Sequence, residues 1–457
     1  MFKAYISIIT MAIMMFSLQG TAQKHYKLLT LEPGHFHAAL VQKTMYPQVD
    51  KDVHVYAPEG PELRSHLALV EGYNQRGTDP THWNEIVYTG RDYFNKMISD
   101  KAGNLLVLAG NNKNKTNYIL QSVAAGINVL ADKPMAIDKT GFDKLQQAFA
   151  LAAKNKVLIY DIMTERYDIT NIIQRELMEM PKVFGQLQKG TPLHPAVIKE
   201  SVHHFFKNVS GKPLIRPAWY FDVKQEGSGI VDVTTHLVDL VKWTCFPDKV
   251  TDYKTDIKIN SARQWATEIS KAQFEKSTQL TDYPDYLKKD VKNDTLHVYS
   301  NGEMNYSLKG VAVKITAIWN FEAPEGGGDT YYSLIKGSKA NLIIRQGAEE
   351  NYNTVLYVEP LKKTADFTRS LEKAIGTISK KFPGVGITPT DKGWKINIPT
   401  QYNIGHEAQF AEVTKQYLKY LQEGKMPQWE ITDMISKYYT TISALEKSKK
   451  YLGKTER

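Results

Sequence analysis

Short apolar runs alternate with longer segments of helical periodicity over the first 160 residues. The runs that we expect to form strands are residues 26–30, 53–57, 104–109, 127–130 and 157–160, and the expected helices are one that begins near Ala38 together with residues 115–125 and 141–155. Strands that alternate with helices at this spacing predict right-handed βαβ units and a parallel sheet. By analogy of architecture, the pattern predicts a Rossmann-like nucleotide-binding domain over residues 24–160.

The pattern changes after about residue 160. Residues 169–180 have the periodicity of an amphipathic helix, and strand-like runs joined by Gly, Asn and Asp turns follow at 185–189, 250–259, 296–299, 302–308, 311–321, 331–336 and 341–345. Consecutive strands without intervening helices predict an antiparallel sheet. The expected fold class is therefore α/β, with a Rossmann-like parallel sheet domain followed by an α+β domain, residues 161–400, that has a largely antiparallel open sheet.

Two helices are expected at the C-terminal end, over residues 407–424 and 432–452, with Pro427 between them. Their apolar residues recur at helical spacing, which favours packing against the body of the protein. We therefore predict a C-terminal unit of helices over residues 401–457. Residues 361–400 match no motif.

The first 23 residues have the pattern of a secretory signal peptide. Lys3 precedes an apolar run from Ala4 to Phe16 that is too short to span a bilayer comfortably, and small residues from Gly20 to Gln23 suit cleavage. We predict an exported, periplasmic protein with no stable membrane span after cleavage, and a retained membrane anchor is the alternative. Cys245 is the single cysteine, so neither a disulfide framework nor a lipid-modified cysteine is available.

Composition narrows the function classes. The chain has 457 residues, which favours more than one domain, and its 42% hydrophobic and 23% charged residues exclude a mostly disordered protein. The net charge of +9 comes from scattered lysines rather than from an arginine-rich run or a basic-aromatic segment. We therefore expect no nucleic-acid partner.

An acid and an imidazole stand four residues apart just after a glycine-rich turn, as Asp232 and His236 behind Gly227-Ser228-Gly229. On a helix this spacing places both side chains on one face, so the carboxylate can orient the imidazole as a proton acceptor. A solvated helix face or a helix cap is the alternative. Lys133, before Pro134, follows an expected strand, and a lysine at the carboxyl end of a parallel strand faces the ligand crevice of an open α/β sheet.

These two segments resemble those of the glucose-fructose oxidoreductase, inositol dehydrogenase and MocA family of nicotinamide-dependent enzymes. Ala125 to Pro134 matches the family's aGxxVxxEKP segment with Asp132 in place of Glu, and Gly227 to Asp239 matches GGGxxxDxxxHxxD with Ser228 in place of the middle glycine. Trp219-Tyr220-Phe221-Asp222 is similar to the family's aromatic lead-in, and Arg166 stands where members often have an Arg-Phe pair. The resemblance implies NAD or NADP as cofactor and a C-terminal sheet that can form a homo-oligomer.

The first turn departs from the dinucleotide fingerprint GxGxxG, in which glycines allow the backbone to approach the pyrophosphate. Only Gly34 remains, and Glu32 stands near the first glycine position. His35 is a candidate phosphate donor or a plain turn residue. Glu59 is the only acid near the expected ribose position, and Asn111 completes the candidate cofactor-binding set of Gly34, His35, Glu59, Asn111 and Lys133.

Aromatic and basic residues near the candidate site favour a carbohydrate or polyol substrate, because sugar rings stack on aromatic faces and bond through hydroxyls. The aromatic residues are Phe205, Phe206, Trp219, Tyr220 and Phe221. The candidate substrate-binding residues are Arg166, His203, Trp219 and Asp232. Each of these also suits a core or surface position.

The predicted mechanism uses Lys133, Asp232 and His236 as catalytic residues. His236 takes the hydroxyl proton while hydride leaves the same carbon, Lys133 polarises the oxygen, and Asp232 holds His236 and the substrate. A metal site made of Asp232, His236 and His203 is an alternative that spacing alone cannot establish, and we expect no metal.

Export makes a consumed cofactor hard to supply, so the nucleotide is expected to be tightly bound if present. Two alternatives to a sugar or polyol oxidoreductase therefore stay open. One is a glycosidase or lyase of the same family that recycles its nicotinamide. The other is a sugar-binding protein that has lost the cofactor.

Overall fold

A computed structural model describes residues 25–209 and 212–455. The predicted signal peptide, residues 1–23, lies outside the described residues. None of the helices within the described ranges has the length and apolar character that a bilayer crossing requires. Export and homo-oligomer formation stay predictions.

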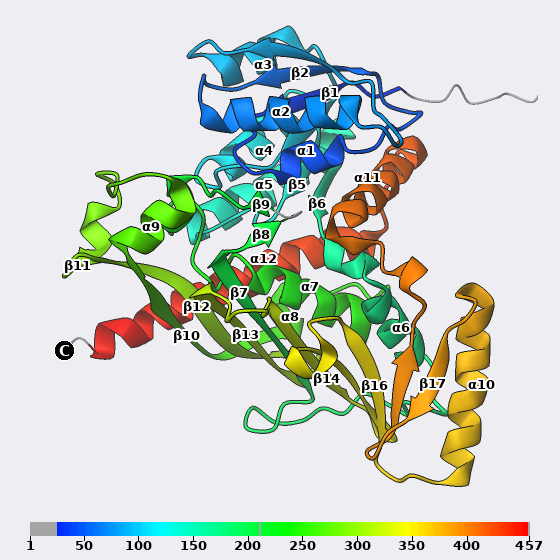
Figure 1. The fold of residues 1–457 in the computed structure, drawn as a ribbon. Helices are drawn as coiled ribbons and strands as arrows, with labels where there is room; N and C mark the ends of the chain where they lie inside the picture. Colours follow the sequence, from blue (N-terminus) through cyan, green and yellow to red (C-terminus); the bar gives the residue numbers. More distant parts are fainter. Residues whose placement is uncertain (1–24, 210–211, 456–457) are drawn as a thin grey trace, which may run out of the picture.

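A six-stranded parallel sheet forms the N-terminal part of the fold (Figure 1). Its strands are β1 (Leu28–Leu31), β2 (Asp52–Tyr56), β3 (Asn84–Tyr88), β4 (Leu105–Leu108), β5 (Asn128–Asp132) and β6 (Ile159–Ile162), and its helices are α1 (His37–Val41), α2 (Pro61–Gln75), α3 (Tyr93–Asp100), α4 (Lys115–Ala124) and α5 (Lys139–Asn155). The strand order β3-β2-β1-β4-β5-β6 reverses direction between β1 and β4. Ligands of open α/β sheets bind beyond the carboxyl ends of the strands at such a reversal, and the predicted Rossmann-like fold is confirmed.

Burial explains which strands the sequence revealed. Every residue of β1, β4 and β6 is buried, as expected for strands covered on both faces, and their sequences are short and mostly apolar, with Thr30 in β1 and Asp161 in β6 as the polar residues. Edge strand β3, by contrast, exposes three of its five residues and lacks an apolar run. Its existence was therefore not predicted.

The second sheet has ten strands in the order β10-β12-β13-β7-β14-β15-β16-β18-β17, with β11 paired to β12. The strands are β7 (Val197–Phe206), β10 (Ile257–Ser270), β11 (Val291–Lys292), β12 (Thr295–Leu308), β13 (Val311–Glu322), β14 (Thr330–Lys336), β15 (Ala340–Gln346), β16 (Val355–Pro360), β17 (Gly386–Pro389) and β18 (Trp394–Asn397). All pairs are antiparallel except β13 with β7. The prediction of a largely antiparallel open sheet is confirmed.

Shorter elements and helices complete the chain. They are the two-stranded pair β8 (Asn208–Val209) and β9 (Lys212–Pro213), the 3₁₀ turns η1 (Thr164–Tyr167), η2 (Ala218–Phe221), η3 (Lys288–Asp290), η4 (Ala348–Glu350) and η5 (Thr400–Tyr402), and the helices α6 (Ile169–Met178), α7 (Thr234–Cys245), α8 (Tyr253–Asp256), α9 (Lys271–Thr278), α10 (Ala365–Lys381), α11 (Gly405–Glu423) and α12 (Gln428–Thr455). Residues 361–400, which matched no motif, thus contain α10, β17 and β18.

Three strand predictions are corrected. Residues 185–189 form no strand, because Gly185 adopts φ +79° and only an isolated bridge joins Leu187 to Gly337. In residues 250–259, the Asp252 carboxylate accepts a hydrogen bond from Lys254 N and caps helix α8, so β10 begins only at Ile257. The two runs at 296–299 and 302–308 are one continuous strand, β12.

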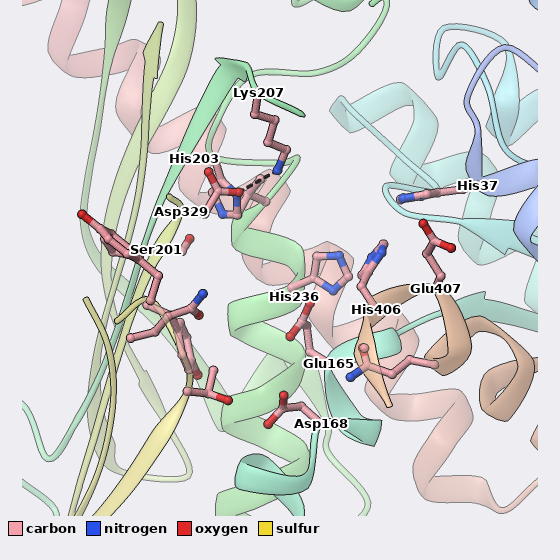
Figure 2. A pocket seen from close by; sticks show the side chains of 18 of the residues that line it. His37, Glu165, Asp168, Ser201, His203, Lys207, His236, Asp329, His406 and Glu407 are labelled. Carbon is pink, nitrogen blue, oxygen red and sulfur yellow. Dashed lines mark hydrogen bonds and ion pairs between the residues drawn. The ribbon is translucent and has the colours of Figure 1, made fainter. Parts of the chain in front are cut away.

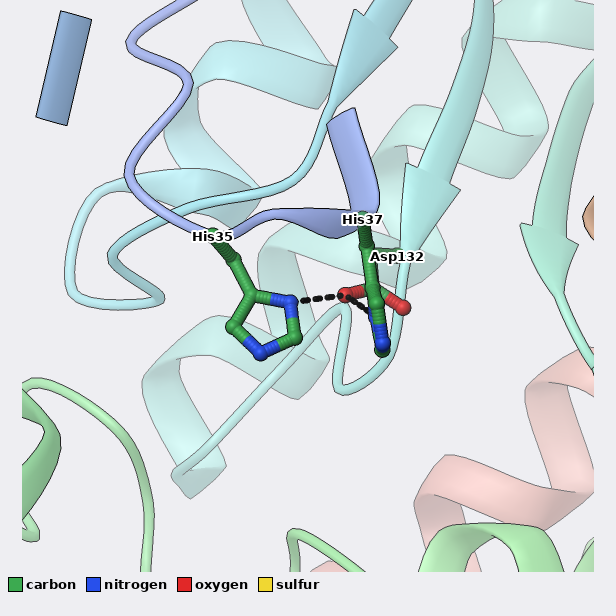
Figure 3. Close-up of side chains that lie close together, drawn as sticks. All are labelled: His35, His37 and Asp132. Carbon is green, nitrogen blue, oxygen red and sulfur yellow. Dashed lines mark hydrogen bonds and ion pairs between the residues drawn. The ribbon is translucent and has the colours of Figure 1, made fainter. Parts of the chain in front are cut away.

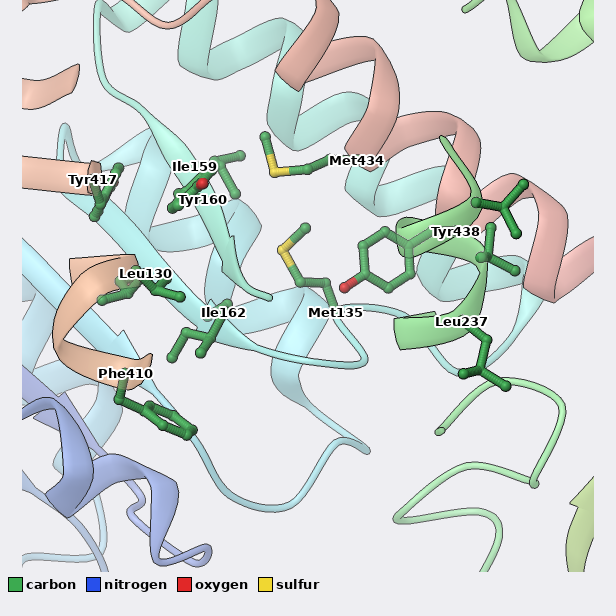
Figure 4. Packing of buried hydrophobic residues seen from close by; sticks show 14 of the residues in the cluster. Leu130, Met135, Ile159, Tyr160, Ile162, Leu237, Phe410, Tyr417, Met434 and Tyr438 are labelled. Carbon is green, nitrogen blue, oxygen red and sulfur yellow. The ribbon is translucent and has the colours of Figure 1, made fainter. Parts of the chain in front are cut away.

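The C-terminal helices pack on both parts of the molecule. Helix α11 contacts α1 and β6, whereas α12 contacts α5, α7 and β10. Figure 4 shows this junction, where Tyr417, Met434 and Tyr438 gather around Ile159 and Met135. The apolar face of these helices therefore closes the core between the two sheets.

A close backbone approach fixes the glycine-rich turn before α7. Gly227 adopts φ +105°, and Gly229 N donates to Tyr299 O at 3.0 Å. A Cβ atom at Gly229 would lie 1.9 Å from the carbonyl oxygen of Ser300 on β12. Only glycine fits there, so β12 sets the position of the chain that leads to Asp232.

We expect Gly229→Ala to lower the free energy of unfolding by about 1–3 kcal/mol, because the added methyl group must displace strand β12. The matched control is Gly376→Ala in α10, where a Cβ atom would meet nothing within 4 Å and a gain of up to about 1 kcal/mol is expected. Urea denaturation of both variants provides the measurement. Equal stability of the two variants would contradict the steric account.

Candidate active site

A cavity of about 820 Å³ lies between the two sheets, and the start of α11 lines one side of it (Figure 2). Its lining comes from the β1–α1 turn, the end of β5, η1, β7, α7, β13, β14 and α11. Of the predicted site residues, His35, Lys133, His203 and His236 line this cavity. Gly34, Glu59, Asn111, Arg166, Trp219 and Asp232 do not belong to its lining.

Lys133 directly follows β5, and the peptide bond from Lys133 to Pro134 is cis. The Lys133 side chain forms an ion pair with Asp232. The Nζ–Oδ1 distance is 2.5 Å, and the two side chains are 12% and 6% exposed. Burial alone would lower the pKa of Lys133, but the carboxylates of Asp232, Asp132 and Glu226 outweigh it and raise the pKa. The structure thus keeps a cation at the cavity wall.

His236 lies in the first turn of α7, and its Nδ1 atom is buried without a hydrogen-bond partner among the described residues. Burial and the charge of Lys133 hold the pKa of His236 well below its ordinary value, so the imidazole is neutral. The predicted pairing of His236 with Asp232 is not formed. Helix α7 begins only at Thr234, and the Asp232 carboxylate instead accepts from Lys133.

The β1–α1 turn and the loop after β4 meet at the sheet reversal. His35 N donates to Ala109 O at 3.1 Å, and a Cβ atom at Gly110 would lie 2.3 Å from Glu32 O. Gly34 lies against Asn111 in this crossing, and Glu59 is exposed after the end of β2. The three candidate nucleotide contacts Gly34, Asn111 and Glu59 therefore follow three neighbouring strands, β1, β4 and β2.

Arg166 and Trp219 have other surroundings than we expected. The guanidinium of Arg166 bonds Asp239 through Nε and Nη2 and Glu430 through Nη1, all buried, so its donors are directed at these acids rather than at a substrate. Trp219 packs in an aromatic cluster with Tyr220 and Phe221, and its Cζ2 atom approaches Gly34. Both residues support the site from outside the cavity.

A second polar group occupies the opposite wall, on β7 and before β14. Asp329 pairs with His204 Nδ1 at 2.9 Å and with Lys207 Nζ at 2.6 Å, while His203 Nδ1 lies 3.5 Å from it. Burial would raise the pKa of Asp329, but the hydrogen bond with His203 and the charge of Lys207 hold it far below its ordinary value. Asp329 is therefore a carboxylate that fixes three basic side chains.

Several cavity residues were not singled out from the sequence. They are His37, Glu165, Asp168, Asp329, Trp319 and His406, whereas Lys207 was among the basic residues considered for substrate hydroxyls. Figure 2 shows that His236 of α7 and His406 of α11 face the same space, near Glu165 of η1. His37 and Glu165 adjoin residues that the motifs did mark, whereas nothing in the sequence near His406 signalled a site.

The comparisons with known proteins agree with this architecture. Residues 173–449 match the family model described as "Putative oxidoreductase C terminal domain". The chain therefore belongs to this family of oxidoreductases, which is of the glucose-fructose oxidoreductase, inositol dehydrogenase and MocA type. No curated protein matches the chain.

Among solved structures, a "putative oxidoreductase" from Parabacteroides merdae ATCC 43184 is similar at 53% identity, with a TM-score of 0.92 over 94% of this chain and 99% of that chain. Levoglucosan dehydrogenase in complex with NADH and levoglucosan shares 12% identity, with a TM-score of 0.59 over 93% and 98% of the two chains. A 3-ketoreductase from Actinomadura kijaniata in complex with NADP shares 11% identity, with a TM-score of 0.55 over 93% and 98%. The last two show a common fold.

Glu165 provides a test of the site's electrostatics. Burial, helped by the nearby Asp168 carboxylate, raises the pKa of Glu165 from 4.5 to about 7. Between these values the folded protein binds more protons than the unfolded chain, so the free energy of unfolding falls as pH rises. The penalty is absent below the unfolded pKa and complete above the folded one.

We therefore expect Glu165→Gln to gain stability over wild type as pH rises from about 5 to about 8, by up to about 3 kcal/mol. Denaturant titrations of both proteins at the two pH values measure this difference. The control Glu372→Gln, at an exposed position of α10, should show no such change. A pH-independent difference for Glu165→Gln would show that this carboxyl does not titrate as described.

Proposed function

We propose that the protein is an NAD(P)-dependent oxidoreductase that acts on a hydroxyl group of a sugar or polyol. The observation that carries this proposal is the convergence of Lys133 and His236 on one cavity beyond the carboxyl ends of a parallel sheet. A neutral imidazole can accept a hydroxyl proton, and a nearby cation stabilises the negative charge that develops on the oxygen.

The loops at the sheet reversal fit a dinucleotide at its phosphate part. Gly34 and Gly110 allow the loops after β1 and β4 to pack closely at this reversal, and we assign Gly34, Asn111 and Glu59 to the nucleotide, with Lys133 at the nicotinamide end. When bound, the nicotinamide would accept hydride from the substrate carbon. His35 was predicted as a phosphate donor or a turn residue; its Nδ1 atom lies 3.6 Å from Asp132, so a contact with phosphate would have to come from Nε2.

The chain's own residues move the proton. The side chain of His236 lines the cavity, and the lowered pKa of this histidine keeps it unprotonated before reaction. The ammonium of Lys133 stabilises the negative charge that develops on the substrate oxygen. The Asp232 carboxylate, 2.5 Å away, keeps this ammonium in position. Asp232 thus acts through Lys133, rather than through His236 as the sequence suggested.

The opposite wall supports a polyhydroxylated substrate. Lys207, His203 and Asp329 offer donors and acceptors, while Tyr220 and Trp319 add aromatic surface to the same cavity. Sugars combine hydroxyl groups with apolar ring faces, which matches this lining. Solved structures of the same fold are named as complexes with levoglucosan and with L-sorbose, which favours the same substrate class.

Nucleotide binding is the first test. We expect protein purified gently from its native host to release NAD or NADP on denaturation, detected by mass spectrometry, or the nucleotide-free protein to gain thermal stability with one of them. The reason is the fold, in which the loops after β1 and β4 meet at the reversal of strand order. An empty protein that shows no thermal shift with either nucleotide would favour a sugar-binding protein instead.

The second test addresses the catalytic residues. Lys133→Met and His236→Ala should each lower turnover by about a hundredfold or more while nucleotide binding persists, measured as reduced nicotinamide formed with a panel of sugars and polyols. Because Lys133→Met leaves Asp232 unpaired, the matched control is the double variant Lys133→Met with Asp232→Asn, which removes the buried charge. Restored activity in the double variant would exclude Lys133 from the mechanism.

A further inference from the structure

Two histidines of the β1–α1 turn and the last residue of β5 form a compact cluster at the edge of the cavity (Figure 3). His37 Nδ1 lies 2.9 Å and His35 Nδ1 3.6 Å from the same oxygen, Oδ2 of Asp132. One ligand atom from each of the three residues lies within 4.8 Å of the others. The three side chains thus point at one small volume.

The distances between these ligand atoms suit a cation with tetrahedral coordination. Two ligands that are each about 2.0–2.1 Å from a zinc ion lie roughly 3.3 Å apart. The two Nδ1–Oδ2 distances, 2.9 and 3.6 Å, lie on either side of that value. Shifts of the imidazole and carboxylate groups by a few tenths of an ångström would therefore bring both distances to the ligand separation of a tetrahedral zinc site.

One nitrogen atom of the cluster has no hydrogen-bond partner among the described residues. The Nδ1 atom of His35 is buried and has no hydrogen-bond partner within residues 25–209 and 212–455. A buried polar atom without a partner costs free energy, which a bound cation would remove. The other Asp132 oxygen, Oδ1, already accepts from Lys133 N at 2.9 Å, and this bond holds the carboxylate in place for ligation.

The charge of Lys133 does not oppose a cation directly. Its ammonium is paired with Asp232, whereas the Oδ2 atom of Asp132 is directed at the two histidines. Two imidazoles and one carboxylate, with no sulfur ligand, are the donor set of zinc and related first-row divalent cations. Hard cations such as Mg²⁺ prefer oxygen ligands alone.

We propose that His35, His37 and Asp132 bind a divalent first-row transition-metal cation, with zinc as the principal candidate, at a position open to the cavity. His35 and His37 line the cavity that Lys133 and His236 also line, and the ring of His406 lies 5.3 Å from that of His37. Three protein ligands leave a coordination position for an oxygen of the substrate. The cation would act as a Lewis acid toward a hydroxyl or carbonyl oxygen, with no change of its own oxidation state.

Metal binding at this cluster does not depend on the nucleotide, so it can be tested separately from the proposed oxidoreductase activity. The protein, freed of any polyhistidine tag and treated with a chelator, is titrated with Zn²⁺ by calorimetry and with Co²⁺ by visible absorption. We expect about one equivalent of each ion to bind, a Co²⁺ spectrum typical of tetrahedral coordination, and a melting temperature that rises with Zn²⁺.

The variants His35→Gln and Asp132→Asn should each weaken Zn²⁺ binding by about a hundredfold or more. The matched controls are His203→Gln, a histidine of the same cavity outside the cluster, and His194→Gln, on the surface, and both should bind as wild type does. If Asp132→Asn fails to fold, His35→Gln still decides, because His35 has no side-chain hydrogen bond to lose at Nδ1.

Three outcomes would overturn the site. They are a wild-type protein that binds neither ion, unchanged binding in His35→Gln, or a loss of binding in His203→Gln that matches the loss in His35→Gln. Failure of the nucleotide to bind would leave these results unaffected. Conversely, an active oxidoreductase that binds no zinc would reject the metal site and retain the proposed activity.

Discussion

A buried ion network at the junction of the two sheets is the constraint on which the site depends. Lys437 of α12, fully buried, lies 2.6 Å from Asp161 of β6 and 2.7 Å from Asp239 of α7. Arg166 of η1 bonds the same Asp239 and also Glu430 of α12. Burial would raise the pKa of Asp239, but Arg166 and Lys437 hold it below its ordinary value. Loss of one partner would leave a buried charge uncompensated, so these elements must stay together.

The network determines where His236 stands, because Asp239 lies one turn further along the same helix. Helix α7 is fixed to the parallel sheet because Lys437 pairs with both Asp239 of α7 and Asp161 of β6. The turn before α7 is fixed to the second sheet because Gly229 packs against β12. Lys133 reaches the same place from β5 and is held there by Asp232. Anchoring from both sheets gives the cavity its rigid arrangement of charged and neutral groups, which electrostatic stabilisation of a reacting oxygen requires.

Much of the fold was predictable, and the reasons are local. The buried strands β1, β4 and β6 are short, mostly apolar segments, and β13, β14 and β15 were found within a residue or so of their ends. The exposed edge strand β3 escaped prediction because it lacks an apolar run. The segment with α10, β17 and β18 escaped prediction because it matched no motif, although β17 and β18 pair with each other as a local hairpin. At the site, Lys133 and His236 were identified by motif and do share a cavity, whereas His406 joins it only through the docking of α11.

The sequence by itself determined the alternation of strands and helices, the glycine-rich turn and the types of residue that carry chemistry, because these depend on neighbours along the chain. The tertiary structure alone decided their partners. Asp232 pairs with Lys133, 99 residues away, rather than with His236, four residues away, because α7 begins after Asp232. Arg166 likewise pairs with Asp239 and Glu430, because a buried charge requires an opposite charge beside it and the fold places these two acids there. The raised pKa of Glu165 likewise follows from burial, which only the assembled fold supplies.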